Sequence, residues 1–359
     1  MTARADARAG ARVSARARAF TAFAFTRAIG ALLLGLLVLG AIFAPYIAPY
    51  EPATQFRDHL LAPPMTLRLR DVQGQWRGPF FYPLRIVDRL ERRFAEDRDH
   101  PVPLVLFTNG RMIAPATDAH GPWLAFGSDR LGRDLFSRLL HGARLSLGVA
   151  TIAVIGPILI GAFIGALAGY RGGLIDLALM RFSEFVIVLP ALYVMLAFRS
   201  ILPLSLPTNT VFLLMTTMMA AIGWPTVARG VRAIVTTEVT REYAMAARAL
   251  GASPWRLLGR HILPATLGFL RVQALVLLPS AILAEATLSY AGLGFGPDHP
   301  SWGTLLQEAS DIRAMADYPW LLSAAGAIIL VVLAVNLLLE HQRRPMALAA
   351  VGEARVTRP

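Results

Sequence analysis

The chain has 359 residues, 55% of them hydrophobic, and a formal net charge of +12. This composition excludes an ordinary soluble domain of this size and favours a protein that crosses a membrane several times. Cysteine and lysine are both absent, which excludes disulfides, thiolate chemistry, thiol metal sites and Schiff-base chemistry.

The absence of lysine also limits nucleotide chemistry, because a P-loop needs a lysine that reaches the β- and γ-phosphates. We therefore expect no ATPase site, no enzyme activity and no cofactor in this chain. No clustered set of metal ligands is visible, and the seven histidines are scattered. The arginines flank apolar runs, which fits the positive charge of cytoplasmic loops in membrane proteins and predicts no nucleic-acid partner.

The N-terminal third predicts a tail, a first span and an insert. Residues 1–27 are rich in arginine and form a basic cytoplasmic tail, with a targeting peptide as the alternative. Residues 28–50 carry no charge and are long enough for an uncleaved transmembrane helix. Residues 51–126 are too charged to span and contain β-like runs such as Val102–Phe107. We expect a small extracytoplasmic insert, either a platform for a solute-binding protein or a passive insertion.

Residues 127–144 combine glycines, charges and periodic leucines. Ser128 can cap a helix whose first turn holds Asp129, so we expect an amphipathic helix at the membrane interface, with ion pairs along one side. The stretch also resembles the signature that precedes the second span in bacterial ABC importer permeases of the dipeptide/oligopeptide/nickel branch. The residues that fit this signature are Gly127, Asp129, Gly132, Arg133, Asp134, Ser137, Arg138, Gly142, Arg144 and Ser146.

Residues 145–340 are expected to hold five further spans. The second, Leu145–Tyr170, carries glycines for close helix packing, namely Gly148, Gly161, Gly165 and Gly169. The third, Leu174–Phe198, should be kinked at Pro190. Near its inner end Arg181 and Glu184 form an i, i+3 pair, which is either structural or functional. The fourth span should start near Val211 and end at the interface near Trp224 and Pro225.

The last two spans are expected at His261–Thr287 and Tyr318–Leu339. Glu285, near the outer end of the fifth, either faces a translocation path or reaches the interface. The segment Gly296–Asp317 should lie outside, with Trp302 and Trp320 as interface anchors. Residues 341–359 would form a second cytoplasmic tail.

The loop at residues 236–264 is predicted to form two short helices joined by a corner. Gly251 suits a left-handed helix stop, and Ser253 with Pro254 is typical of the start of the next helix. The exposed part is expected to be small, and alanines flanked by arginines suggest a docking knob outside the membrane, namely Ala244, Ala246, Ala247 and Ala249. The alternative is an ordinary loop lying on lipid headgroups.

This loop resembles the EAA loop of ABC importer permeases through Ala246-Ala247-x-x-x-Gly251 and Ile262-Leu263-Pro264. The leading glutamate of the family pattern falls on Met245, and an isoleucine of the pattern falls on His261. The resemblance implies a coupling helix that docks in a groove of the ATPase subunit. The residues so assigned are Glu242, Tyr243, Ala246, Ala247, Arg248, Gly251, Ala252, Ser253, Leu263 and Pro264.

We therefore expect an all-α integral membrane protein with six transmembrane helices in a bacterial inner membrane, with both termini cytoplasmic. The resemblance implies a permease subunit that works by alternating access and forms a path for di- or oligopeptides. The implied partners are ABC ATPase subunits, a second homologous permease and an extracytoplasmic solute-binding protein. Nickel or another small solute is an alternative substrate.

Two unrelated functions are also open. An ion-driven secondary transporter should show inverted repeats and charged or broken helices in mid-membrane, and its activity should survive ATP depletion. A membrane-anchored interaction protein would act through the insert at residues 51–126 and should tolerate deletion of the loop at residues 236–264.

Overall fold

The computed structural model describes residues 25–71, 74–89, 91–108, 110–116, 121–203, 206–296, 298–311 and 316–356, with side chains up to residue 339. The predicted basic tail, apart from residues 25–27, lies outside the described residues. The tail at residues 341–359 is described only as helical backbone, to residue 356. The chain divides into two compact units, Val38–Ile328 and the combination of Met1–Leu37 with Ile329–Pro359.

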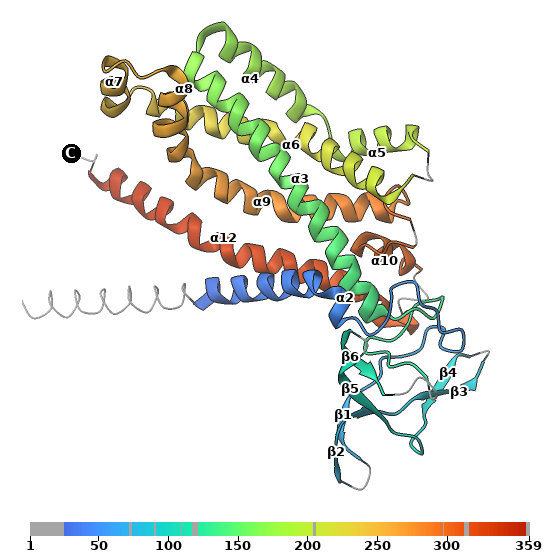
Figure 1. Ribbon diagram of the computed structural model, residues 1–359. Coiled ribbons are helices and arrows are strands. Elements are labelled where there is room, and N and C mark those ends of the chain that lie inside the picture. Colours follow the sequence, from blue (N-terminus) through green and yellow to red (C-terminus); the bar gives the residue numbers. More distant parts are fainter. Residues whose placement is uncertain are drawn as a thin grey trace, which may run out of the picture. The chain divides into compact units, whose positions relative to one another are not determined.

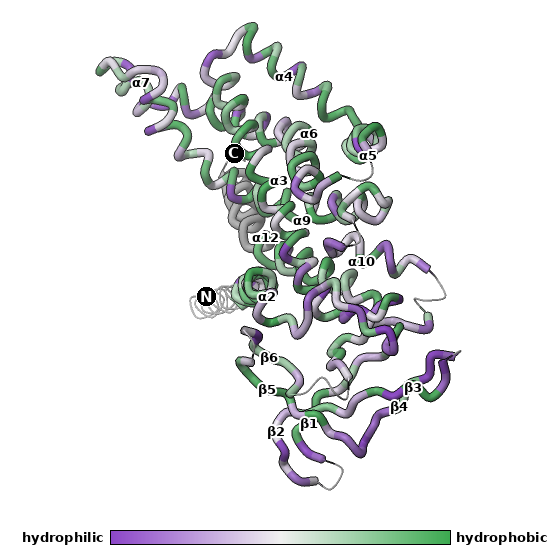
Figure 2. Tube along the Cα trace, turned by 45° about the vertical axis from the view of Figure 1, so that its right-hand side comes forward, coloured by the Kyte–Doolittle hydropathy of each residue, from purple (hydrophilic) through white to green (hydrophobic). Residues whose placement is uncertain are grey.

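Five helices in the described chain are long and apolar enough to cross a membrane (Figure 1). They cover Phe25–Ile42, Leu135–Arg171 (α3), Thr208–Glu238 (α6), Pro254–Tyr290 and Pro319–Leu339. The fourth comprises α8 (Pro254–Leu257), a π-helical turn (Leu258–Ile262) and α9 (Leu263–Tyr290). The fifth begins with a 3₁₀ turn (Pro319–Leu322) and continues as α12 (Ser323–Val356). Figure 2 shows the hydrophobic character of these helices.

A sixth apolar segment is bent. Together, helices α4 (Gly173–Val188) and α5 (Ala191–Ile201) are long and apolar enough to cross a membrane, but their axes differ by 77°. Leu189 between them is extended, with ψ of 126°, because a residue before proline is driven out of the helical region. The predicted kink at Pro190 is confirmed, and the helical multi-span fold class is confirmed with it.

The helices α3 and α6 pack closely because α3 presents glycines at every fourth position. A methyl group at Gly161 would lie 2.7 Å from the carbonyl oxygen of Trp224, and one at Gly169 would lie 2.8 Å from that of Arg232. Gly148 has no such close neighbour, since its nearest atom would be 3.9 Å away. The predicted packing role is therefore confirmed for the glycines in the second half of α3.

The fourth span was expected to end at the interface near Trp224 and Pro225, but the helix itself does not end there. Helix α6 contains Pro225 and continues to Glu238. Trp224 is buried, and its ring stacks on Phe182 of α4 with centroids 5.8 Å apart. Its indole packs against α4, so its function here is packing.

The insert is a small β-rich unit. An antiparallel sheet has the order β1-β2-β5-β6, built from β1 (Arg68–Arg70), β2 (Trp76–Phe81), β5 (Val102–Thr108) and β6 (Arg111–Pro115). A separate hairpin pairs β3 (Leu84–Asp88) with β4 (Arg93–Glu96). Phe81, Val102, Leu104, Trp123 and Leu124 form the buried centre. The predicted β-strand at Val102–Phe107 is thus confirmed as β5.

Two short helices flank the start of α3. Helix α2 (Ala44–Ile47) precedes the insert, and α10 (Trp302–Glu308) follows α9. Trp302 was expected at the membrane interface, but it is fully buried and its Nε1 donates to the carbonyl of Leu139 at 3.2 Å. That prediction is wrong because Trp302 fills the contact between α10 and α3. Trp320 is half-buried and donates to the carbonyl of Ser128 at 3.2 Å.

The second unit brings the first helix against the C-terminal part of α12. A methyl group at Gly30 would lie 2.8 Å from the carbonyl oxygen of Ala334. Glycine at this position therefore allows the two backbones to approach closely.

Candidate functional site

The loop at residues 236–264, called the coupling loop below, contains α7 (Glu242–Ala249) and α8. Helix α7 ends in a Schellman motif: Ala252 N donates to the carbonyl of Ala247 at 3.0 Å, and Gly251 N to that of Arg248 at 2.9 Å. Gly251 has φ of +81°, a conformation that favours glycine. The predicted corner between two short helices is confirmed.

The second helix starts as its sequence predicts. Ser253 is the N-cap of α8 and its Oγ accepts from Arg256 N at 3.4 Å, while Pro254 occupies the first turn. The chain then makes the π-helical turn and enters α9, where Pro264 lies at the helix start. Helix α8, the π-helical turn and α9 therefore form one continuous helical path.

The coupling loop is fixed to the helical bundle by one buried face. Ala244 of α7, Leu257 of α8 and Ile262 are fully buried in one cluster with valines of α6 and Ala166 of α3. Ala244 was expected on the surface of the docking knob; instead it is the residue through which α7 contacts its own bundle. Its small side chain sets how closely α7 approaches α6.

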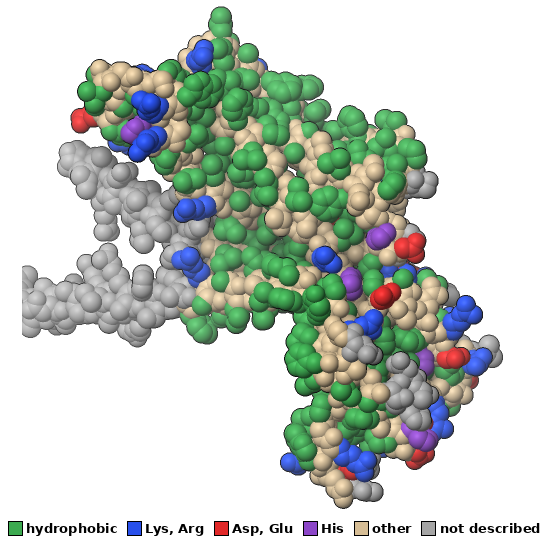
Figure 3. All heavy atoms as spheres, viewed as in Figure 1, with side chains coloured by type: hydrophobic (Ala, Val, Ile, Leu, Met, Phe, Trp, Pro, Cys, Tyr) green, Lys and Arg blue, Asp and Glu red, His purple; other side chains and the backbone are tan. Residues whose placement is uncertain are grey.

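The opposite face of the loop is exposed and apolar. Leu250 is 88% exposed and Trp255 is 72% exposed, while Tyr243 and Met245 are also exposed. Arginines surround these residues, as Figure 3 shows around α7; the exposed ones are Arg241, Arg248, Arg256 and Arg260. The patch covers α7 and the first residues of the candidate span Pro254–Tyr290. An exposed apolar patch with a charged rim is typical of a protein–protein contact.

Two side-chain contacts hold α7 in its orientation. The guanidinium of Arg248 lies 5.3 Å from the ring centre of Tyr170, near the end of α3. The Tyr243 hydroxyl donates to Glu238 Oε2 at 2.6 Å. Desolvation and this carboxylate raise the pKa of Tyr243 to about 12, so the phenol keeps its proton at neutral pH. Arg248 thus packs on its own chain as well as facing solvent.

The signature at residues 127–144 does not begin as a helix. Residues 127–134 form a tight turn with isolated bridges from Ser128 to Asp134 and from Gln55 to Arg133. Helix α3 starts only at Leu135, with Asp134 as its N-cap, and continues without a break to Arg171. The predicted interfacial helix is wrong because Gly127 and Gly132 both have positive φ, which ends any regular helix there.

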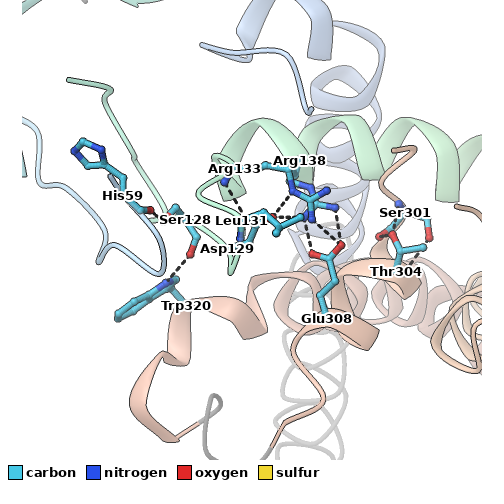
Figure 4. A network of polar contacts seen from close by, with 10 residues as sticks. All are labelled: His59, Ser128, Asp129, Leu131, Arg133, Arg138, Ser301, Thr304, Glu308 and Trp320. Atoms are coloured by element: carbon cyan, nitrogen blue, oxygen red, sulfur yellow. Dashed lines mark hydrogen bonds and ion pairs between the residues drawn. The ribbon is translucent and has the colours of Figure 1, made fainter. Parts of the chain in front are cut away.

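The turn instead builds a buried ion network, shown in Figure 4. Arg138 is fully buried, donates to Asp129, and forms a bidentate pair with Glu308 at 2.5 and 2.9 Å. Arg133 donates to Asp129 Oδ2 at 2.7 Å and to Glu308 Oε1 at 3.0 Å. We call Asp129, Arg133, Arg138 and Glu308 the latch. Its two positive and two negative charges balance, and it joins the turn, α3 and α10.

Backbone groups supply further hydrogen bonds to the latch. Asp129 Oδ1 accepts from the amides of Leu131 and Arg133 at 2.8 and 2.9 Å. Asp134 accepts from Ser137 N at 2.8 Å. A methyl group at Gly127 would lie 2.6 Å from the Ala62 carbonyl. The signature residues therefore have mainly a structural task, although Arg144 is exposed and lies outside this network.

Glu308 was missed by sequence reasoning. It lies about 170 residues after its partners, in a segment with no periodic pattern, and only its position at the end of a capped helix could have drawn attention to it. That helix, α10, begins with a capping box formed by Ser301 and Thr304. The charges of residues 129–138 predict ion pairs but not this distant carboxylate.

Glu285 lies in the neighbouring contact between α9, α3 and α10. It is fully buried, and its two carboxylate oxygens accept from Ser146 and Ser289, both at 2.7 Å. Ser146 also accepts from the amide of Trp302 at 3.1 Å. Glu285 therefore connects α9 to α3 and α10, and in this structure it reaches neither the interface nor an open path.

Comparison with known proteins gives the family. Residues 161–346 match the binding-protein-dependent transport system inner membrane component family, and residues 28–64 match the N-terminal TM domain of oligopeptide transport permease C. The chain is 36% identical over 310 residues to the di/tripeptide transport system permease protein DppC of Pseudomonas aeruginosa (strain UCBPP-PA14), covering 86% of this chain and 83% of the relative.

Two further relatives agree with this. The chain is 30% identical over 311 residues to the dipeptide transport system permease protein DppC of Haemophilus influenzae, covering 86% of each protein. It is 36% identical over 212 residues to the oligopeptide transport system permease protein OppC of Bacillus subtilis, covering 59% of this chain and 67% of the relative. The resemblance predicted from the signature and the coupling loop is confirmed, and the chain belongs to the family of binding-protein-dependent transport system inner membrane components.

Proposed function

We propose that the chain is the permease subunit of an ATP-driven importer that carries di- or oligopeptides across the inner membrane. The observation that carries this proposal is the coupling loop, whose one face is buried in the bundle while the other is exposed, apolar and rimmed by arginines. The relatives named as peptide permeases support the substrate class. Nickel is the alternative substrate within the same family.

The packing suggests how the loop would act. A partner ATPase that binds and hydrolyses ATP would displace α7, and Ala244 and Leu257 would pass the displacement to the valines of α6. Helices α3 and α6 would move as one body. The glycines of α3 bring the two backbones into close contact, so the helices cannot shift past one another by less than the size of a side chain. Rocking of this body against the other helices opens the path alternately to the two sides.

The two ends of α3 would then face the two sides of the membrane. With 37 residues, α3 is about 55 Å long, and the coupling loop packs near its C-terminal end. We assign that end and both termini to the cytoplasm, and the insert to the outer side. A solute-binding protein would dock on the insert, whose base the latch holds to α3 and α10. A second homologous permease would complete the path.

The test is uptake by the reconstituted importer. Proteoliposomes would hold the chain, the second permease and ATPase encoded with it, and the binding protein, with a labelled dipeptide or ⁶³Ni²⁺ outside. We expect dipeptide uptake that requires both ATP and the binding protein. Uptake that survives ATP depletion and follows an ion gradient would establish a secondary transporter, and uptake of nickel alone would overturn the substrate class.

A further inference from the structure

A charged cavity lies between α4 and the second half of α6. Its volume is about 650 Å³, within the range of about 300–1,000 Å³ usual for small-molecule sites. Its lining is mainly charged, in a chain whose helices are otherwise apolar. The charged lining residues are Asp176, Arg181, Glu184, Arg229 and Arg232.

The cavity lies toward the end of α6 from which the coupling loop continues. Arg229 lies nine residues before the end of α6, about 13 Å along the helix axis, and Glu184 lies eleven residues after the start of α4, about 16 Å along it. Charged side chains on membrane-spanning helices usually face a water-filled cavity or a pathway. The position therefore fits the inner end of a translocation path.

The charges are arranged in two pairs and one unpaired group. Asp176 accepts a bidentate pair from Arg232, with both contacts at 2.5 Å. Arg181 and Glu184 form an exposed pair at 3.0 Å, which solvent weakens and which can exchange partners at little cost. Arg229 has no ion-pair partner within the described residues. The cavity thus offers one free cation and one exchangeable carboxylate.

We propose that this cavity binds a short peptide in transit by its two charged ends. The free carboxylate of the peptide pairs with Arg229 and its ammonium group with Glu184. A site for a simple anion would be uniformly basic, whereas a zwitterion needs both signs close together. The inference rests on the proposed function and adds to it the class of peptide, one with free amino and carboxyl termini.

The absence of native cysteine allows a direct test. A cysteine replaces Met180, which lines the cavity, or Thr236, which is exposed on α6 outside it. The importer in nanodiscs is labelled with a charged maleimide, with the binding protein and ATP, with and without dipeptide. We expect dipeptide turnover to slow labelling at least threefold for Met180→Cys and to leave Thr236→Cys unchanged.

Charge variants separate binding from folding. Arg229→Gln should reduce dipeptide uptake about tenfold while ATP hydrolysis stimulated by the loaded binding protein persists, and Arg229→Lys should restore most of the uptake. Arg171→Gln, which changes an exposed arginine at the same end but outside the cavity, is the control.

The outcomes are distinct. An importer that transports dipeptide, yet shows no protection at Met180→Cys, overturns the cavity as a binding site. Equal loss of uptake and ATP hydrolysis in Arg229→Gln, without rescue by lysine, assigns Arg229 a structural role and also overturns it. An unmodified importer that moves no peptide contradicts the proposed function itself, and the inference with it.

Discussion

At one end of α3, Arg138 is fully buried among carboxylates, whereas the arginines of the coupling loop near the other end are exposed to solvent. The latch neutralises its charges internally, so it fixes the geometry of one chain. The loop arginines keep most of their charge available for another surface. The comparison teaches that an enclosed arginine stabilises the fold of its own chain, whereas an exposed arginine keeps its charge available to another surface.

The largest expected effect comes from breaking the latch. Arg138→Ala leaves Glu308 and Asp129 with one guanidinium between them, and an uncompensated buried charge costs about 3–5 kcal/mol. We therefore expect a large fall in the unfolding temperature of the detergent-purified chain, measured by fluorescence during heating. Arg130→Ala is the matched control, since its pair with Asp311 is about half exposed and should contribute roughly 0–1 kcal/mol. Equal losses in the two variants would contradict a special role for the latch.

The buried face of α7 should be the next most sensitive. Ala244→Leu forces a larger side chain between α7 and the valines of α6, and overpacking of this kind costs about 1–3 kcal/mol. Ala249→Leu adds the same atoms to an exposed position of the same helix. We expect only Ala244→Leu to lower the unfolding temperature and to reduce coupled ATP hydrolysis. A stable Ala244→Leu would show that α7 does not transmit motion through this contact.

The exposed face should matter for association and not for folding. Leu250→Asp places a charge in the centre of the apolar patch, so we expect binding to the ATPase to weaken at least tenfold, which is about 1.4 kcal/mol. Its unfolding temperature should stay near that of the parent because Leu250 touches little of its own chain. Leu250→Met keeps the apolar contact and is the control. Binding can be measured by co-purification with titrated ATPase.

The smallest effect concerns the N-cap of α3. Burial raises the pKa of Asp134 to about 6, from an ordinary value of 3.8. The folded state therefore holds this proton more tightly, and the stability contribution is present below about pH 4 and is lost as the pH rises through 6. Asp134→Asn keeps the cap and should remove this slope. Asp134→Ala loses the cap as well, at about 1 kcal/mol. Unfolding curves between pH 4 and 7 would compare the three proteins.

The sequence predicted the parts of the molecule that depend on neighbours along the chain. The apolar spans, the kink at Pro190 and the corner at Gly251 and Ser253 follow from composition and backbone preference, and the structure has all of them. The glycine face of α3 was also predicted, since its spacing alone places it on one side of a helix. These features are local and need no knowledge of partners.

The parts that were missed depend on distant contacts. Residues 127–134 have the charges and a leucine that fit an amphipathic helix, yet two glycines and the enclosure of Arg138 by Glu308 make a turn of them. Trp302 was expected at the interface because tryptophan is enriched there, but it is buried against α3. Ala244 has the same side chain as its more exposed neighbours, so nothing local indicated that it is the fully buried one.

One measurement tests most directly the claim that the coupling loop docks on an ATPase. Leu250→Cys supplies the only thiol of the chain, at an exposed site that does not cap a helix. Oxidative crosslinking in membranes would pair it with a cysteine placed in the expected groove of the ATPase, and Val87→Cys on the insert is the exposed control. We predict a crosslink at Leu250→Cys that changes with ATP, and none at Val87→Cys. A Leu250→Cys chain that reacts freely with a thiol reagent but forms no crosslink would contradict the coupling role of this loop.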